Sequence, residues 1–192
     1  MPEVVLIRHG ETEWSRTGKH TGRTDISLTE RGREQAVDVG SALRGRRFAL
    51  VLTSPLERAA ETCRLAGYGE VAERRDELME WDYGDYEGRK TVDIRKELPG
   101  WTLWRDGVPG GETAAEVGGR ADRVIAELRA QTGDAAVFGH GHVLRVLAAR
   151  WVGLAPEGGQ LFALDPGTLS VLGHERETPV LRSWNATAAS AG

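Results

Sequence analysis

The chain has 192 residues, 40% of them hydrophobic and 28% charged, a composition typical of one soluble globular domain. Its formal net charge of −4 at pH 7 argues against a nucleic-acid partner held by a general basic surface, so any anion binding must be local. The single cysteine, Cys63, excludes an intrachain disulfide and is typical of a reducing compartment.

Membrane and secretion signals are the next features to consider. No apolar run approaches the roughly 20 residues that a membrane-spanning helix needs. The first predicted strand begins within a few residues of Met1, which leaves no room for a signal peptide. We therefore expect a cytoplasmic protein with a single domain over residues 1–192 and no membrane partner; a homodimer is compatible with the sequence.

A buried strand with a reactive end opens the chain. Val4 to Ile7 is an unbroken apolar run, typical of a strand covered on both faces in a parallel sheet. Ligands of such sheets bind beyond the carboxyl ends of the strands, where Arg8 and His9 stand. Guanidinium groups bind phosphate in bidentate fashion, and neutral imidazole is a nucleophile near neutral pH. The pair therefore indicates a phosphate site, although a surface loop explains it equally well.

Residues 15–27 predict a loop, and a helix is expected to follow with Thr29 as its N-cap. Within the loop, Thr21 and Gly22 could present a hydroxyl and backbone N–H groups to an anion, while Lys19 and Arg23 add positive charge. A solvated turn is the alternative for this segment.

The second strand is followed at once by a helix start. Residues 48–52 predict a buried strand, and Ser54 before Pro55 predicts a helix with Ser54 as its N-cap. Arg58 then lies in the first turn, near the carboxyl end of the strand. A cation there opposes the helix dipole, which hints at a function, with a surface arginine as the alternative. We interpret Cys63 as a small buried side chain rather than a nucleophile.

The middle of the chain supplies candidate acids. A short strand is predicted over residues 70–75, and residues 78–88 then mix carboxylates with aromatic side chains. Aromatic walls favour the protonated form of a carboxyl group, as a general acid requires, and Glu80 is our candidate; a solvated loop is the alternative. Residues 84–113 predict a short helix and a lid-like loop, in which Trp101 and Trp104 cover either the site or a satellite hydrophobic cluster.

The last part of the chain repeats the strand-then-histidine pattern. After an amphipathic helix that begins near Thr113, a third apolar strand over residues 135–138 ends at His140, and another helix follows. Further strands are predicted over residues 161–164, 169–172 and 180–184, with a frayed tail over residues 186–192.

Three strand ends thus carry polar side chains that would converge if the strands are parallel neighbours. We assign His9, neutral, as the nucleophile on phosphorus, with Arg8, Arg58 and protonated His140 holding the phosphate oxygens. Glu80 would protonate the leaving alkoxide and then, as a carboxylate, activate the water that releases phosphate from the histidine. These cations make a metal unnecessary, so we expect neither a metal nor another cofactor.

Several side chains stay open. A metal site built on His140 and His142 is an alternative, but no His-Glu-x-x-His pattern or cysteine pair supports it. A second phosphate or sugar hydroxyls could be bound by Lys19, Arg23, Arg89 or Arg105. His20 stays undecided within the candidate phosphate loop, and structural roles are favoured for His142 and His174.

In combination these motifs resemble the histidine phosphatase superfamily, whose fold is phosphoglycerate-mutase-like. The matching motifs are Arg8 to Thr12, Thr21-Gly22, Ser54-Pro55 with Arg58, Leu78-x-Glu80, Gly111 to Thr113, and Gly139 to Gly141. The resemblance implies an α/β three-layer sandwich with a mostly parallel central sheet, His9 as phospho-acceptor and Glu80 as proton donor. It also implies a phosphate pocket of Arg8, Arg58 and His140. We further expect substrate contacts from Thr21, Gly22, Ser15, Arg23 and Gly141.

Departures from the family's mutases favour its phosphatase branch. Ser15 stands where mutases usually have Asn, Trp81 follows the acid in place of Arg, and residues 89–111 lack an adjacent arginine pair. The pattern is similar to mycobacterial-type acid phosphatases and sedoheptulose-1,7-bisphosphatases. We therefore expect a metal-independent phosphomonoesterase for a small phosphorylated metabolite, in particular a sugar phosphate. A cofactor-dependent phosphoglycerate mutase and a non-catalytic phospho-ligand binding module are the alternatives.

Overall fold

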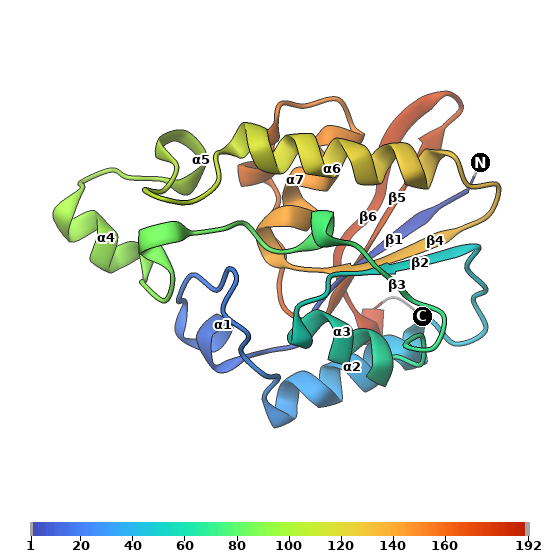
Figure 1. Cartoon of the computed structure of the whole chain (residues 1–192). Coiled ribbons are helices and arrows are strands. Elements are labelled where there is room, and N and C mark those ends of the chain that lie inside the picture. The colour runs from blue at the N-terminus through green and yellow to red at the C-terminus, as the bar shows by residue number, and fades with distance from the viewer. Residues whose placement is uncertain (1, 191–192) are drawn as a thin grey trace.

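A computed structural model describes residues 2–190, and over these residues one mixed sheet forms the centre of the molecule (Figure 1). Its strand order is β3-β2-β4-β1-β5-β6. The first four strands in that order run parallel, β5 is antiparallel to β1, and β6 is antiparallel to β5. The strands are β1 (Val4–Arg8), β2 (Leu50–Thr53), β3 (Glu73–Arg74), β4 (Ala135–Gly139), β5 (Thr168–Glu175) and β6 (Thr178–Thr187).

Helices cover both faces of the sheet and complete three layers. Alternate residues of β1 point to opposite faces: Val4 and Leu6 join one hydrophobic cluster, Val5 and Ile7 the other. The first cluster lies between the sheet and helices α6 and α7, and the second lies between the sheet and helices α2 and α3 (Figure 1). This confirms the predicted α/β class. The covering helices are α2 (Glu30–Ala42), α3 (Glu57–Leu65), α6 (Ala114–Arg129) and α7 (Gly141–Trp151).

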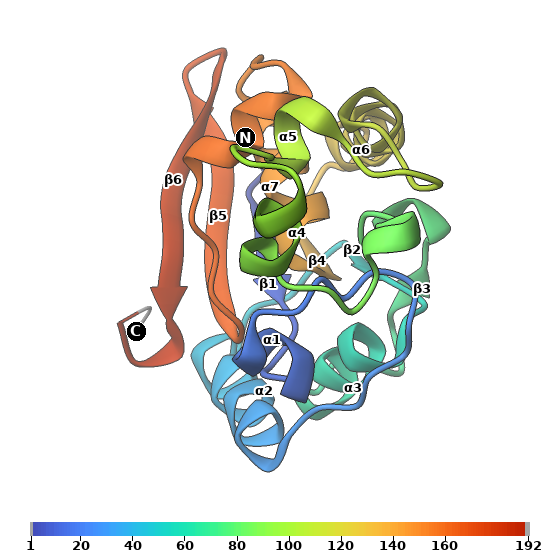
Figure 2. The ribbon, with the colours of Figure 1, turned by 90° about the vertical axis from the view of Figure 1, so that its left-hand side faces the viewer.

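The remaining helical segments connect these layers. The short helices α1, α4 and α5 lie around the edge where β1 and β4 end, the edge that faces the viewer in Figure 2. They are α1 (Glu13–Thr17), α4 (Thr91–Glu97) and α5 (Leu103–Asp106), and 3-10 turns cover Asp76–Leu78, Gly84–Tyr86, Pro156–Leu161 and Ala188–Ser190. None of the described helices combines the length and hydropathy that crossing a membrane requires.

Two predicted helix starts have different outcomes. Thr29 caps α2 as predicted, with its side chain accepting the N–H of Gly32. Ser54 does not cap α3, which begins only at Glu57 after Leu56 as N-cap. The Ser54 hydroxyl instead accepts the N–H of Leu56 at 3.2 Å and contacts Nε2 of His140. His140 thus competes with the start of α3 for the Ser54 hydroxyl.

Two predictions for the last part of the chain are wrong. Residues 161–164 do not form a strand: a 3-10 turn ends at Leu161, which is 73% exposed, and irregular backbone follows. Residues 186 and 187, expected in a frayed tail, belong to β6, where Ala186 pairs with Leu169 and Thr187 with Thr168. The part of that tail at residues 191–192 lies outside the described residues.

Candidate active site

The register of the parallel strands brings the two histidines together. Arg8 stands opposite Gly139 in the pairing of β1 with β4, so His9 and His140 leave the sheet side by side. Their ring centroids are 5.1 Å apart, in an edge-to-face arrangement. Ser54, which follows β2 on the other side of β4, reaches the same place, and its Oγ lies 2.7 Å from His140 Nε2.

A backbone carbonyl fixes which nitrogen of His9 carries the proton and which keeps its lone pair. The Nδ1 atom lies 2.7 Å from the carbonyl oxygen of Gly10, which can only accept, so Nδ1 carries the proton and Nε2 keeps its lone pair. Burial and the charges of Arg58 and Arg8 lower the pKa of His9 well below 6.5, which keeps the ring neutral. Gly10 is required here because a Cβ would lie 2.1 Å from the carbonyl oxygen of Gly32 on α2.

The two arginines hold the surrounding loops while remaining close to His9. Arg58 is fully buried on the first turn of α3 and donates to the carbonyls of Thr21, Gly22 and Thr24 at 2.8–3.1 Å. Arg8 donates to the carbonyl of Leu164. Arg58 therefore shapes the predicted anion loop from behind, rather than lying on the surface.

Three buried nitrogen atoms beside His9 have no hydrogen-bond partner among the described residues. They are Nε of Arg8, Nε of Arg58 and Nδ1 of His140. An unsatisfied buried donor costs roughly 1–3 kcal/mol, so native proteins keep few of them without a reason. A bound oxyanion would supply the missing partners, and the cluster is therefore a candidate phosphate site.

Our prediction of a protonated His140 concerns the complex with phosphate, and without a bound anion the surroundings of His140 oppose its protonation. Burial, followed by the charges of Arg58, His9 and Arg8, lowers the pKa of His140 well below 6.5. Burial and the nearby cations thus favour the neutral ring while no anion is bound. Its unpartnered Nδ1 can still accept a proton, or donate one, when an anion enters.

The amino-terminal turn of α7 holds the candidate acid. Glu80 Oε1 accepts the backbone N–H groups of Trp81 and Val143, and Oε2 accepts that of His142, each at 2.9 Å. The first helix turn leaves such N–H groups without intrahelical partners, and the Glu80 oxygens supply the missing acceptors. Since His140 is the N-cap of the same helix, α7 positions both Glu80 and His140.

Glu80 and His9 line one cavity of about 90 Å³. Of the predicted residues, Arg8, Thr21 and Gly141 line it as well, and a Cβ on Gly141 would approach the Arg8 Cζ to 3.3 Å. Glycine thus lets the guanidinium approach the start of α7. The cavity is also lined by residues to which the sequence analysis assigned no definite role. They are Lys19, His20, Tyr83, His142, Arg145 and Leu164.

An ion pair between the buried Arg120 and the half-buried Glu112 supports the segment that carries Glu80, and sequence reasoning missed it. Glu112 accepts two hydrogen bonds from Arg120, at 2.8 and 2.9 Å, and its Oε2 accepts the N–H of Asp82 at 2.9 Å. The Glu112 carbonyl accepts the indole N–H of Trp81 at 2.8 Å. The sequence feature that could have revealed this ion pair is Arg120, a cation among the apolar positions of α6.

Other residues that we predicted to contact the substrate lie outside the cavity. Ser15 completes a capping box with Thr12 at the start of α1, and the Nη2 of Arg23 lies 3.5 Å from Glu112. Gly22 contributes its carbonyl to Arg58, and none of these three residues lines the cavity. The same holds for the candidates Arg89 and Arg105, which pair with Glu97 and Asp106, and for His174, which packs on Trp151.

The histidines after β4 have separate partners. His140 binds Ser54, whereas His142 Nδ1 lies 2.6 Å from the Tyr83 hydroxyl. Within residues 2–190, no three His, Cys, Asp or Glu side chains form a group suited to a metal ion. Trp104 packs against the rings of Trp81 and His142, so it forms part of the wall beside the cavity.

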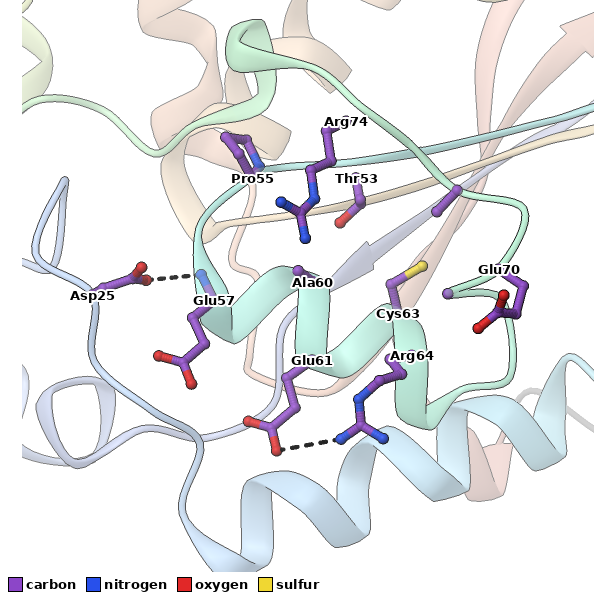
Figure 3. Close-up of a pocket in the computed structure, with 12 residues that line it drawn as sticks. Asp25, Thr53, Pro55, Glu57, Ala60, Glu61, Cys63, Arg64, Glu70 and Arg74 are labelled. Carbon is purple, nitrogen blue, oxygen red and sulfur yellow. Dashed lines mark hydrogen bonds and ion pairs between the residues drawn. The ribbon is translucent and has the colours of Figure 1, made fainter.

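A larger hollow of about 490 Å³ lies between α3 and β3 (Figure 3). Cys63, Glu57 and Arg74 are among its lining residues, but none of the predicted site residues lines it. Burial raises the pKa of the Cys63 thiol to about 12, which agrees with its interpretation as an inert side chain. This hollow is therefore separate from the candidate phosphate site around His9.

A buried neutral imidazole that shares a cavity with Arg8 and Glu80, with Arg58 and His140 buried next to it, is the arrangement expected of a phosphoryl-transfer enzyme. The model of the histidine phosphatase superfamily (branch 1) matches residues 4–187, and the chain belongs to this family.

Relatives of known activity agree with this assignment. An acid phosphatase of Mycobacterium tuberculosis is 40% identical over 176 residues, which cover 90% of this chain and 86% of that protein. A sedoheptulose 1,7-bisphosphatase of Saccharomyces cerevisiae is 38% identical over 186 residues, covering 80% and 68%. These likenesses place the chain among the phosphomonoesterases of the family.

Solved structures share the fold over nearly the whole chain. That of an open reading frame from Mycobacterium tuberculosis matches with a TM-score of 0.93 at 38% identity and covers 97% of this chain and 98% of that one. A mycobacterial glucosyl-3-phosphoglycerate phosphatase, solved with VO3, matches with a TM-score of 0.87 at 28% identity, covering 97% and 100%.

Proposed function

We propose that the chain hydrolyses phosphate monoesters of small sugar-like metabolites through a phosphohistidine at His9. The observation that supports this most is the set of three unpartnered buried nitrogens, on Arg8, Arg58 and His140, beside a histidine whose Nε2 lone pair is free. A phosphoryl group placed among them would meet two fixed cations and a nucleophile at once.

The reaction divides into two balanced steps. In the first, His9 Nε2 bonds to phosphorus while the bond from phosphorus to the ester oxygen breaks, and Glu80 gives its proton to the departing alkoxide. In the second, the Glu80 carboxylate takes a proton from water, whose oxygen attacks phosphorus and breaks the bond to Nε2. Arg8 and Arg58 offset the charge on the phosphoryl oxygens in both transition states.

Relatives support a sugar-like substrate. The yeast relative is named for sedoheptulose 1,7-bisphosphate, and a glucosyl-3-phosphoglycerate phosphatase of Mycolicibacterium vanbaalenii is 31% identical over 167 residues. The test is phosphate release by the purified protein, with chelator present, from a panel of sugar phosphates, phosphoglycerates and nucleotides. We expect turnover of sugar phosphates that is lost in His9→Asn. Turnover confined to nucleotides would contradict the substrate class, and His9-independent turnover would contradict the mechanism.

A mutase is the second candidate, because a 2,3-bisphosphoglycerate-dependent phosphoglycerate mutase of Mesorhizobium japonicum is 34% identical over 185 residues. Trp81, directly after the acid, is fully buried and binds the Glu112 carbonyl, so that position offers no charge to a glycerate carboxylate. Incubation with 3-phosphoglycerate and a bisphosphoglycerate primer separates the two functions. We expect phosphate release to exceed isomerisation; the reverse order would make the protein a mutase.

A further inference from the structure

The carboxylate of Glu87 holds the backbone of the loop that follows α1, and it has no role in the two steps of the proposed reaction. Its Oε1 accepts the N–H groups of Gly22 and Thr24 at 2.8 and 3.2 Å. A Cβ at residue 22 would lie 2.5 Å from Oε2, so glycine lets the carboxylate approach the backbone. The N–H of Gly22, which we predicted to face a substrate anion, is therefore taken by an anion of the protein itself.

Arg58 binds the same loop through its carbonyl oxygens. Its Nη1 donates to Thr24, and its Nη2 donates to Thr21 and Gly22, at 2.8–3.1 Å. Gly22 and Thr24 thus give their carbonyl oxygens to a buried cation and their N–H groups to an anion. The loop backbone connects the two charged side chains, so a displacement of Glu87 would be transmitted to Arg58.

The charge of Glu87 is not shared with another cation at close range. No ion pair within 4.0 Å involves Glu87 in the part of the chain that the structure describes. Hydrogen bonds to an ionised acceptor are roughly twice as strong as those between neutral groups. Burial lowers the pKa of Arg58, and Glu87 is one of the carboxylates whose charge opposes this effect. Glu87 therefore supports both the position and the charge of Arg58.

The position of Arg58 matters because its Nε is one of the three unpartnered nitrogens beside His9. A guanidinium group is planar and presents its donors in a fixed fork. The loop carbonyls that hold Nη1 and Nη2 therefore also fix the direction of Nε. A loop that shifted would turn the whole group, Nε included.

Neighbouring backbone contacts fix Glu87 itself. Its own N–H donates to the Gly84 carbonyl at 3.1 Å, which closes the 3-10 turn before it. The Gly88 N–H donates to the His20 carbonyl, and the His20 N–H donates to that of Arg89, each at 2.8 Å. Glu87 is not among the described residues that line the cavity, so it acts on the loop and not on a substrate.

We propose that Glu87 is a positioning residue for phosphoryl transfer, which holds Arg58, through the backbone of residues 21–24, in the orientation that binds the transferred group. This proposal rests on the proposed function and adds to it a carboxylate that touches neither the substrate nor the reacting atoms. The effect of Glu87 should therefore appear in the affinity of the site for an oxyanion as well as in turnover.

Binding of orthovanadate, an analogue of the transferred phosphoryl group, measures this effect without turnover. By isothermal titration calorimetry, we expect Glu87→Ala to weaken orthovanadate binding about tenfold, because two charge-assisted hydrogen bonds to the loop are lost. Glu87→Gln keeps an oxygen at the same place and should restore the affinity to within about threefold of the wild-type value. Glu116→Ala is the matched control, because Glu116 accepts the N–H of Thr113 at the start of α6, and it should leave the affinity unchanged.

A second background shows whether the effect passes through Arg58. The Arg58→Lys variant lacks the guanidinium that Glu87 orients, so the additional Glu87→Ala replacement should weaken binding less than about twofold there. Urea unfolding establishes that the compared variants are folded. If Glu87→Ala does not fold, Glu87→Asp takes its place, because its shorter side chain withdraws the carboxylate from the Gly22 N–H and should weaken binding by about threefold or more.

The outcomes separate this role from the proposed function. Wild-type affinity in Glu87→Ala would overturn the positioning role, and so would an equal loss in the wild-type and Arg58→Lys backgrounds, which would indicate a general structural effect. In both cases, His9-dependent phosphate release by the wild-type protein would leave the proposed function standing. A wild-type protein that neither binds orthovanadate nor releases phosphate would overturn both proposals.

Discussion

His9 and His140 lie with their ring centroids 5.1 Å apart because β1 and β4 are adjacent parallel strands that end at the same level. Each imidazole is kept neutral by burial and by the charges of Arg58 and Arg8, which lower its pKa. One ring therefore keeps a nucleophilic lone pair at Nε2, and the other keeps an unpartnered Nδ1 beside it. Under the proposed function, a phosphoryl group that enters this site would meet the Nε2 lone pair of His9 and the unpartnered nitrogen of His140 together.

Replacement of Glu80 tests its role as proton donor. In Glu80→Gln we expect kcat for alkyl phosphates to fall about 10²- to 10⁴-fold, because the alkoxide then leaves without a proton. The loss should be much smaller for p-nitrophenyl phosphate, whose phenolate is a good leaving group. Steady-state kinetics on both ester types measures this difference, with the exposed Glu97→Gln as control. Equal losses on both esters would argue for a purely structural Glu80.

Ser54 is predicted to position His140 through the 2.7 Å contact between its Oγ and Nε2. In Ser54→Ala we expect kcat to fall about 3- to 10-fold, the worth of one neutral hydrogen bond, with rescue by Ser54→Thr. Ser41→Ala, on the exposed side of α2, serves as the control. Ser54→Ala with wild-type kcat, or failure of the threonine variant to restore kcat, would contradict the positioning role.

Acid should destabilise the fold through buried histidines, of which His20 gives the clearest case. Burial lowers the pKa of His20 from 6.5 to about 4, so between these pH values the unfolded chain binds a proton that the folded chain does not. The stability contributed by the neutral ring is complete above pH 6.5 and is lost as the pH falls towards 4. Between pH 7.5 and 5 this loss amounts to roughly 2 kcal/mol.

Urea unfolding at pH 7.5 and pH 5 checks this expectation. His20→Gln should lose roughly 2 kcal/mol less stability than the wild-type protein over that interval, because glutamine does not titrate. His174→Gln is a suitable comparison, since His174 lies near Trp151, away from the site. The same pH dependence in the wild-type protein and His20→Gln would contradict a neutral buried His20.

The sheet and its reactive edge could be predicted because each buried strand is a short unbroken apolar run followed at once by polar residues. Parallel neighbours end at a common edge, so the proximity of His9 and His140 follows from the local pattern once β1 and β4 are known to be adjacent. The unfavourable position of Arg58 in a first helix turn was a second usable signal, and the structure buries that side chain completely.

Other features depend on contacts between distant segments and leave little local trace. Ser54 before Pro55 is a helix-start pattern, yet His140 takes the hydroxyl. Residues 161–164 are apolar enough for a strand, but Leu161 is exposed and the Leu164 carbonyl accepts from Arg8. The place of Arg145 at the cavity depends on the Gly159 carbonyl and the Trp104 ring, so no motif predicted it.

The central claim is that the phosphoryl group passes through His9. Incubation with a substrate, an alkaline quench that preserves phosphohistidine, and peptide mass spectrometry measure this most directly. We predict a phosphoryl group on the peptide that contains His9 during turnover, and its absence, with loss of phosphate release, in His9→Asn. A phosphoryl group on another side chain, or undiminished phosphate release by His9→Asn, would contradict the account.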